Sequence, residues 1–134
     1  MSNYSEEQLN RIWAKGRTVF GLNADVYRLD VVGAMMKRSC YGKEESLGWE
    51  VDHIFPKKML EECKIPEELH DNILNLHPMN SKNNVKKGND YPGYKSALEY
   101  DANLRMNVEN EFPCTVDTKL QAALADLFGL NEEL

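Results

Sequence analysis

Long apolar runs are missing from this chain. None of its 134 residues belongs to an apolar stretch near the roughly 18 residues that a membrane span needs. The first ten residues, MSNYSEEQLN, have neither the basic region nor the apolar region of a secretory signal. We therefore expect no membrane association and a cytoplasmic location.

Cysteine is scarce and scattered. Cys40, Cys63 and Cys114 are far apart and form no CxxC pair, which argues against a disulfide framework and against a cysteine-rich zinc knuckle. Internal repeats and low-complexity segments are also missing. With 42% hydrophobic and 28% charged residues, the composition is that of a soluble globular protein. The length suits one domain, residues 1–134, with a modest core.

An excess of positive charge is missing too, since the formal net charge is -6. The charge is unevenly distributed, however. Residues 1–95 hold 14 basic and 14 acidic side chains, whereas residues 96–134 hold 2 basic and 8 acidic ones. A local basic surface around Lys82, Lys86, Lys87 and Lys95 can therefore coexist with an acidic total. The acidic residues 96–134 are a candidate surface for a protein partner.

Helix signals are clearest at the two ends of the chain. Ser5 is a good N-cap and Gln8 stands at the capping-box position, so we expect a helix over residues 6–15. Thr115 precedes an apolar stripe of helical period, which predicts a final helix over residues 116–128.

Extended segments are expected in the first half. The apolar run 31–36 suits a buried strand or a short helix, and we prefer an extended segment. The stretch LGWEVDHI predicts a second strand, with Trp49 and Asp52 on opposite faces. A short helix then begins at Met79 or Asn80 and ends at Gly88.

The segment after Pro92 alternates between apolar and polar residues. This pattern predicts a hairpin of residues 94–100 and 104–108, and a helix over residues 97–106 is the alternative. Residues 57–71 are charged and irregular, apart from one helical turn after Pro66.

The chemistry of the chain is concentrated between Trp49 and Pro92. The imidazole of His53 suits a general base because its pKa lies near neutrality. The Asp52 carboxylate and the amides of this stretch offer oxygen ligands of the kind that Mg²⁺ prefers. Asp52 and His53 should point to opposite faces of a strand unless the strand ends at His53. Of the amides, three are spaced to lie along one helix: Asn80, Asn83 and Asn84.

The motifs V-D-H-I-x-P, N-L-x-P-M and N-N-x-x-K-G-N-D resemble the HNH endonucleases, which are the ββα-metal nucleases. The resemblance is specific over about residues 41–92, and the ββα-metal motif within it covers about residues 47–90. Together with the end helices and the hairpin it implies an α+β fold: a ββα-metal (HNH) core with an N-terminal helix, a C-terminal hairpin and a C-terminal helix.

Matched residue by residue, the resemblance implies a role for each position. His53 is the general base and Asp52 the first metal ligand. Asn75 supports catalysis by steadying the loop that aims the histidine. Asn84 is the second ligand, which makes this chain an H-N-N variant of the motif. Lys87 is a phosphate or scaffold contact.

The same resemblance implies the cofactor and the partner. Because the third position is Asn rather than His, Mg²⁺ or Mn²⁺ is favoured over Zn²⁺ or Ni²⁺. The partner is DNA, double-stranded by preference, with Lys57, Lys58 and Lys86 as further substrate contacts. Lys86 and Lys87 could instead serve only as a favourable helix C-terminus.

The function expected from these residues is metal-dependent hydrolysis of DNA phosphodiester bonds. In the implied mechanism the metal binds a non-bridging oxygen and the 3′-leaving oxygen. His53 activates a water molecule, and the products carry 5′-phosphate and 3′-hydroxyl ends. The alternative is a catalytically silent nucleic-acid-binding module that keeps the HNH scaffold and acts in a larger complex.

Overall fold

The computed structural model describes residues 4–130, which form α-helices, 3-10 helices (η) and short antiparallel strands. The elements, in chain order, are α1 (Glu6–Trp13), β1 (Tyr27–Leu29), β2 (Met35–Lys37), η1 (Arg38–Cys40), β3 (Trp49–His53), α2 (Lys57–Glu62), η2 (Glu67–Leu69), η3 (Ile73–Asn75), β4 (Leu76–Asn80), α3 (Ser81–Lys87), β5 (Gly93–Lys95), β6 (Leu98–Asp101), β7 (Met106–Glu109), β8 (Pro113–Thr115) and α4 (Thr118–Leu127). The chain is therefore of the α+β class, with small antiparallel sheets.

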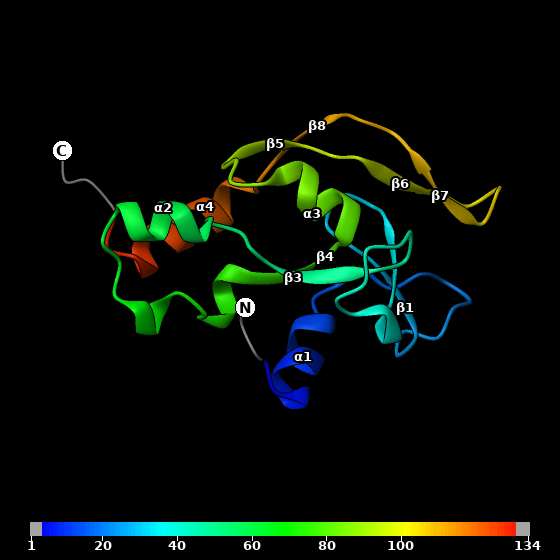
Figure 1. The fold of residues 1–134 in the computed structure, drawn as a ribbon, viewed down its shortest axis with the longest axis horizontal. Helices are drawn as coiled ribbons and strands as arrows, with labels where there is room; N and C mark the ends of the chain where they lie inside the picture. Colours follow the sequence, from blue (N-terminus) through cyan, green and yellow to red (C-terminus); the bar gives the residue numbers. More distant parts are fainter. Residues whose placement is uncertain (1–3, 131–134) are drawn as a thin grey trace.

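The antiparallel pair β3–β4 lies at the centre of the molecule, with α1 on one side and α3 on the other (Figure 1). In its register Trp49 is opposite Asn80, Asp52 is opposite His77, and His53 is opposite Leu76. Because side chains alternate along a strand, this register decides which residues of β3 and β4 share a face.

One face of the β3–β4 pair packs against α1. Trp49 is fully buried there, and its ring centroid lies 5.1 Å from that of Trp13 and 4.9 Å from that of Tyr41. Leu9, Ile12, Met36 and Leu76 belong to the same cluster. The expected capping box at Ser5 is confirmed, since its hydroxyl accepts from the backbone N–H of Gln8 while the Gln8 side chain accepts from the N–H of Ser5. The helix ends at Trp13, slightly earlier than expected.

The larger core lies beyond the end of β3. Ile54 and Phe55 pack there with Leu60 of α2, Leu124 of α4 and Phe128, which directly follows α4. The rings of Phe55 and Phe128 are 5.5 Å apart, centroid to centroid. This core holds the segment after β3 in place, where the motif residues begin.

Helix α3 follows β4 without a loop and begins at Ser81, just after the predicted start at Met79 or Asn80. Asn80 is its N-cap, and the side-chain oxygen accepts from the N–H groups of Lys82 and Asn83. Gly88 ends the helix with φ 53°, a left-handed conformation that glycine adopts readily.

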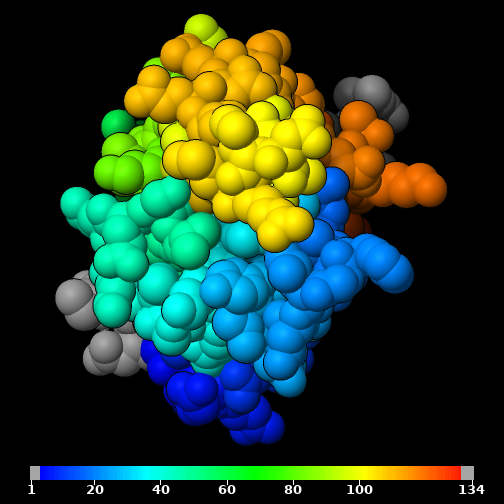
Figure 2. All heavy atoms as spheres, turned by 90° about the vertical axis from the view of Figure 1, so that its right-hand side faces the viewer, coloured from blue at the N-terminus to red at the C-terminus, as the bar shows by residue number. Residues whose placement is uncertain are grey.

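The hairpin expected after Pro92 is confirmed in part. Strands β6 and β7 form it, and Asp101 pairs with Met106 at its turn. The first part of the predicted strand 94–100 was wrong, because Tyr94 and Lys95 belong to β5, which pairs with the distant β8 and not within the hairpin. Figure 2 shows the yellow and orange atoms of this region against the cyan and blue atoms of residues 20–50. Asn107 makes that contact by bonding both backbone groups of Met35, at 2.8 and 2.9 Å.

Two helix predictions need correction. Residues 57–71 were expected to be irregular apart from the turn after Pro66, but 57–62 form α2. The final helix begins at Thr118, because Asp117 rather than Thr115 caps it by accepting from Lys119 and Leu120. Across residues 4–130, no helix is long and apolar enough to cross a membrane.

Candidate functional site

The alternation of β3 separates Asp52 from Trp49, as expected, whereas His53 falls on the Trp49 side of the strand. Trp49 points to the α1 side, whereas Asp52 points to the α3 side, where it meets Lys87. Asp52 is only 5% exposed. A buried carboxylate needs partners, because desolvation of the charged form is costly.

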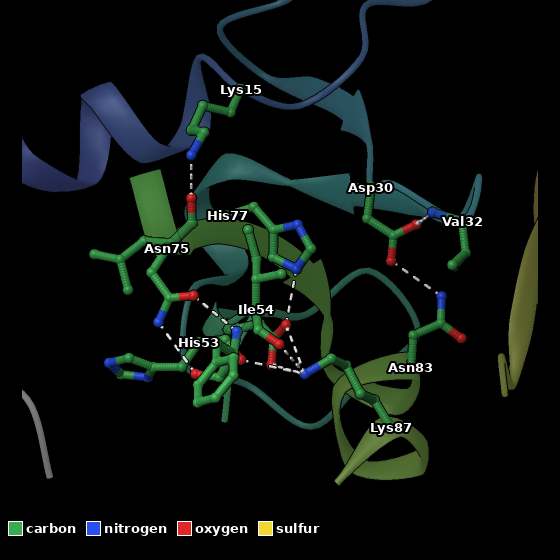
Figure 3. A network of polar contacts seen from close by, with 12 residues as sticks. Lys15, Asp30, Val32, His53, Ile54, Asn75, His77, Asn83 and Lys87 are labelled. Carbon is green, nitrogen blue, oxygen red and sulfur yellow. Dashed lines mark hydrogen bonds and ion pairs between the residues drawn. The ribbon is translucent and has the colours of Figure 1, made fainter. Parts of the chain in front are cut away.

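Asp52 has two such partners. His77, directly opposite on β4, places its Nε2 2.8 Å from Oδ2 of Asp52. The Nζ of Lys87 lies 3.3 Å from Oδ2 and 3.4 Å from Oδ1. Figure 3 shows Lys87 and His77 pointing toward one another across this carboxylate. His77 precedes Pro78 in a short apolar segment, and no local sequence pattern predicted its contact with Asp52.

Lys87 is enclosed by the protein. It is 1% exposed, and besides Asp52 it donates to the backbone carbonyls of His53 and Ile54, both at 3.2 Å. Its Nζ also lies 5.9 Å from the ring centroid of Tyr94. Of its two expected roles, this geometry favours the scaffold contact, because the ammonium is not presented to a phosphate.

His53 belongs to a different set of contacts. Its Nε2 lies 2.7 Å from Oδ1 of Asp71, which also accepts from the hydroxyl of Tyr4 at 3.1 Å. Burial tends to raise the pKa of Asp71, but the hydrogen bond and charge of His53, with smaller contributions from Tyr4 and Lys57, outweigh it and hold the pKa below its ordinary value. An imidazole that donates from Nε2 to a carboxylate keeps the Nδ1 lone pair free to accept a proton.

The side chains of Asp52 and His53 therefore face different partners, although they are neighbours in sequence. β3 ends at His53, yet the imidazole points away from His77 and Lys87 in Figure 3.

Asn75 fixes the backbone just after the strand. It is fully buried, its side-chain oxygen accepts from the N–H of Phe55 at 2.7 Å, and its side-chain nitrogen donates to the carbonyl of Phe55 at 3.1 Å. Its own carbonyl accepts from Ile54 at 2.8 Å. This pairing holds the segment that follows His53, which is the bracing geometry expected of Asn75.

Only one of the three helix amides is left uncommitted. Asn80 caps α3 and donates to the carbonyls of Met35 and Ser46. Asn83 is buried and is bonded on both its oxygen and its nitrogen. Asn84 is half-buried, and its side chain makes no hydrogen bond within residues 4–130. Of the competing asparagines, it is the one whose amide is free to bind something else.

Asp30 is a site residue that the sequence did not reveal. Its Oδ1 accepts from three backbone N–H groups at 2.9 to 3.1 Å, those of Val32, Gly33 and Ala34. Its Oδ2 accepts from Asn80 N and Asn83 Nδ2, both at 3.0 Å. Burial raises the pKa of Asp30, and these donors oppose that rise. Asp30 thereby fixes the start of α3, and no local pattern could have shown contacts about fifty residues away.

The surface lysines form a weaker basic patch than the sequence suggested. Lys86 and Lys95 both approach Glu111, at 3.4 and 3.6 Å. Lys57 and Lys58 lie exposed at the start of α2. Because Lys87 is buried as well, the free positive charge near α3 is reduced to Lys82 and part of Lys86.

The oxygen atoms around the Lys87 ammonium are of the type that binds a hard cation. Four oxygens surround the Lys87 ammonium: both carboxylate oxygens of Asp52 and the carbonyls of His53 and Ile54. Such an all-oxygen environment is what Mg²⁺ and Mn²⁺ prefer, and here a lysine provides the positive charge. Within residues 4–130, no three His, Cys, Asp or Glu side chains group as a metal site. A divalent ion would therefore depend on Asp52, an amide such as Asn84, and water.

No protein-family model, no curated protein and no solved structure matches this chain.

Proposed function

We propose that the chain is a small metal-dependent endonuclease of the ββα-metal (HNH) class that hydrolyses phosphodiester bonds in DNA. The observation that carries this proposal is the order β3–β4–α3, with a carboxylate-oriented histidine at the end of its first strand. Hydrolysis of a phosphodiester needs a base beside the attacking water and positive charge at the phosphate.

In this proposal His53 is the general base. Asp71 holds its Nε2 and leaves Nδ1 to take the proton from water, so the imidazole is oriented before substrate binds. Asn75 is a positioning residue, because it fixes the backbone of Phe55 directly after the base. The geometry of the reacting histidine thus depends on one carboxylate and one amide.

Asp52 and Asn84 would hold the divalent ion, Mg²⁺ or Mn²⁺. When bound, such an ion supplies positive charge to the phosphate and to the leaving oxygen. Asn84 supports this assignment, since its amide has no hydrogen-bond partner within residues 4–130. Asp52 is already paired with His77 and Lys87, so the lysine would have to share or yield the carboxylate.

Plasmid nicking tests the proposal. Supercoiled DNA is incubated with Mg²⁺ or Mn²⁺ and with the wild type, His53→Ala or Asp71→Asn. We expect nicking by the wild type, a loss of about 10²-fold or more for His53→Ala, and a loss of about tenfold for Asp71→Asn. Equal nicking by the wild type and His53→Ala would remove His53 from the role of base.

A second candidate is a nucleic-acid-binding module without turnover. Two observations favour this second candidate. Lys87 already neutralises the Asp52 carboxylate that a metal ion would need, and the acidic residues 96–134 offer a surface for a protein partner in a larger complex. DNA binding that needs no divalent ion, without cleavage in any divalent ion, would select this candidate over the nuclease.

A further inference from the structure

A surface cavity adjoins the proposed site. Its volume is about 330 Å³. Most of its lining is aliphatic, including Val31 and Ile54, and His77 also lines it. Two exposed basic residues of the lining, Lys15 and Arg17, are called its rim below.

Hydrogen bonds to the backbone hold Arg17 and Lys15 in place. The backbone of Arg17 pairs with that of Leu29 through two bonds of 2.8 Å, and its guanidinium donates to the carbonyl of Asp30 at 3.3 Å. Lys15 donates to the carbonyls of Ile73, at 2.8 Å, and Leu76. Neither has a carboxylate partner within residues 4–130, and none of the lining residues is acidic. Within that range the rim therefore carries positive charge without a direct ion pair, and the Glu99 carboxylate lies near Arg17, since both side chains lie beside Gly33.

The cavity shares two residues with the contacts of Asp52 and Lys87. His77 lines it and bonds Asp52 through Nε2. Ile54 also lines it, and its carbonyl accepts from Lys87. A ligand in the cavity would therefore lie one side chain away from the Asp52 carboxylate.

We propose that this cavity receives one unpaired nucleotide of the nucleic-acid strand, with its base on the aliphatic floor and its phosphate at Arg17 and Lys15. An apolar floor suits the face of a base, which is hidden inside a perfect duplex and is accessible only when the nucleotide is everted or unpaired. The basic rim suits the phosphate. The choice of DNA as the polymer rests on the proposed function.

Binding without divalent ions tests this site separately from cleavage. The probes are a labelled DNA duplex and the same duplex with a one-nucleotide bulge, followed by fluorescence anisotropy in EDTA. Arg17→Gln removes one of the two rim charges, and Arg11→Gln is its matched control because Arg11 is an exposed arginine on α1 outside the cavity. Val31→Trp fills the cavity from a position that is 53% exposed.

We expect the wild type to bind the bulged duplex about tenfold more tightly than the perfect one. Arg17→Gln and Val31→Trp should each remove most of that preference, whereas Arg11→Gln should keep it and weaken both probes by about twofold or less. Unchanged thermal denaturation curves confirm that the variants fold. Equal affinity of the wild type for the two probes, or equal losses for Arg17→Gln and Arg11→Gln, would overturn the inference.

The two proposals can fail independently. If the wild type prefers the bulge but cleaves nothing in Mg²⁺ or Mn²⁺, the cavity stands and the nuclease proposal falls. If the wild type nicks plasmid but shows no preference for the bulge, the nuclease proposal stands and the cavity inference falls.

Discussion

Replacing Lys87 by Met is the sharpest test of how the site is held together. Methionine keeps much of the length and apolar volume of the lysine stem but removes the ammonium. Among residues 4–130, the Asp52 carboxylate would then keep only His77 as a side-chain partner, and the carbonyls of His53 and Ile54 would lose a donor.

The expected cost follows from burial. Lys87 is 1% exposed and Asp52 5%, so the carboxylate left behind has little access to water. Removing one partner of a buried ion pair typically lowers the free energy of unfolding by about 3–5 kcal/mol. For a chain of this size we expect the midpoint of thermal unfolding to fall by about 10 °C or more.

Lys86→Met is the matched control. Lys86 is exposed and lies 3.4 Å from Glu111, and a surface pair of this kind contributes about 0–1 kcal/mol. Urea denaturation of both variants gives the comparison, and Asp52→Leu combined with Lys87→Met should recover part of the loss, because no charge is then left unpaired. If Lys87→Met is no less stable than Lys86→Met, the buried ion pair does not hold the site.

Three further predictions concern two asparagines and the loss of stability at acid pH. Asn84→Ala should change the free energy of unfolding by less than about 0.5 kcal/mol and should abolish nicking. Its control, Asn83→Ala, should lower the free energy of unfolding by about 3 kcal/mol, because four hydrogen bonds are removed. A stable and fully active Asn84→Ala variant would exclude Asn84 as a metal ligand. Asn75→Ala should lose about 2–4 kcal/mol, measured by urea denaturation, since both backbone groups of Phe55 lose their partner, and a change within error would contradict the bracing role. The pKa of Asp71 is lower in the folded chain than its ordinary value. The ionised carboxylate therefore contributes fully to the free energy of unfolding above about pH 4, and this contribution is lost as the pH falls through the lowered pKa. Over that acid range, thermal unfolding should show that Asp71→Asn loses less stability than the wild type, and parallel curves of stability against pH would refute the linkage.

The sequence predicted the elements that are fixed by local signals. The capping box at Ser5, the beginning of α3 next to Asn80 and its end at Gly88 depend on residues within a few positions of each other. The separation of Trp49 from Asp52 follows from strand alternation alone. These features needed no knowledge of distant contacts.

The features that the sequence did not predict depend on contacts between distant segments. Strand β5 pairs with β8 rather than continuing into the hairpin, because only the folded chain brings Gly93 next to Thr115. The partners of Asp52 come from 25 and 35 residues away. For the same reason Lys87 seemed to belong to a basic surface, although it is buried.

Chemical rescue of the general base tests the proposed nuclease mechanism most directly. His53→Gly removes the imidazole and leaves space for a free one. We predict that the wild type nicks plasmid in Mn²⁺, that His53→Gly does so about 10²-fold more slowly or worse, and that added imidazole restores part of the rate to His53→Gly but not to Asn84→Ala. Nicking by His53→Gly at the wild-type rate, with or without imidazole, would contradict the account.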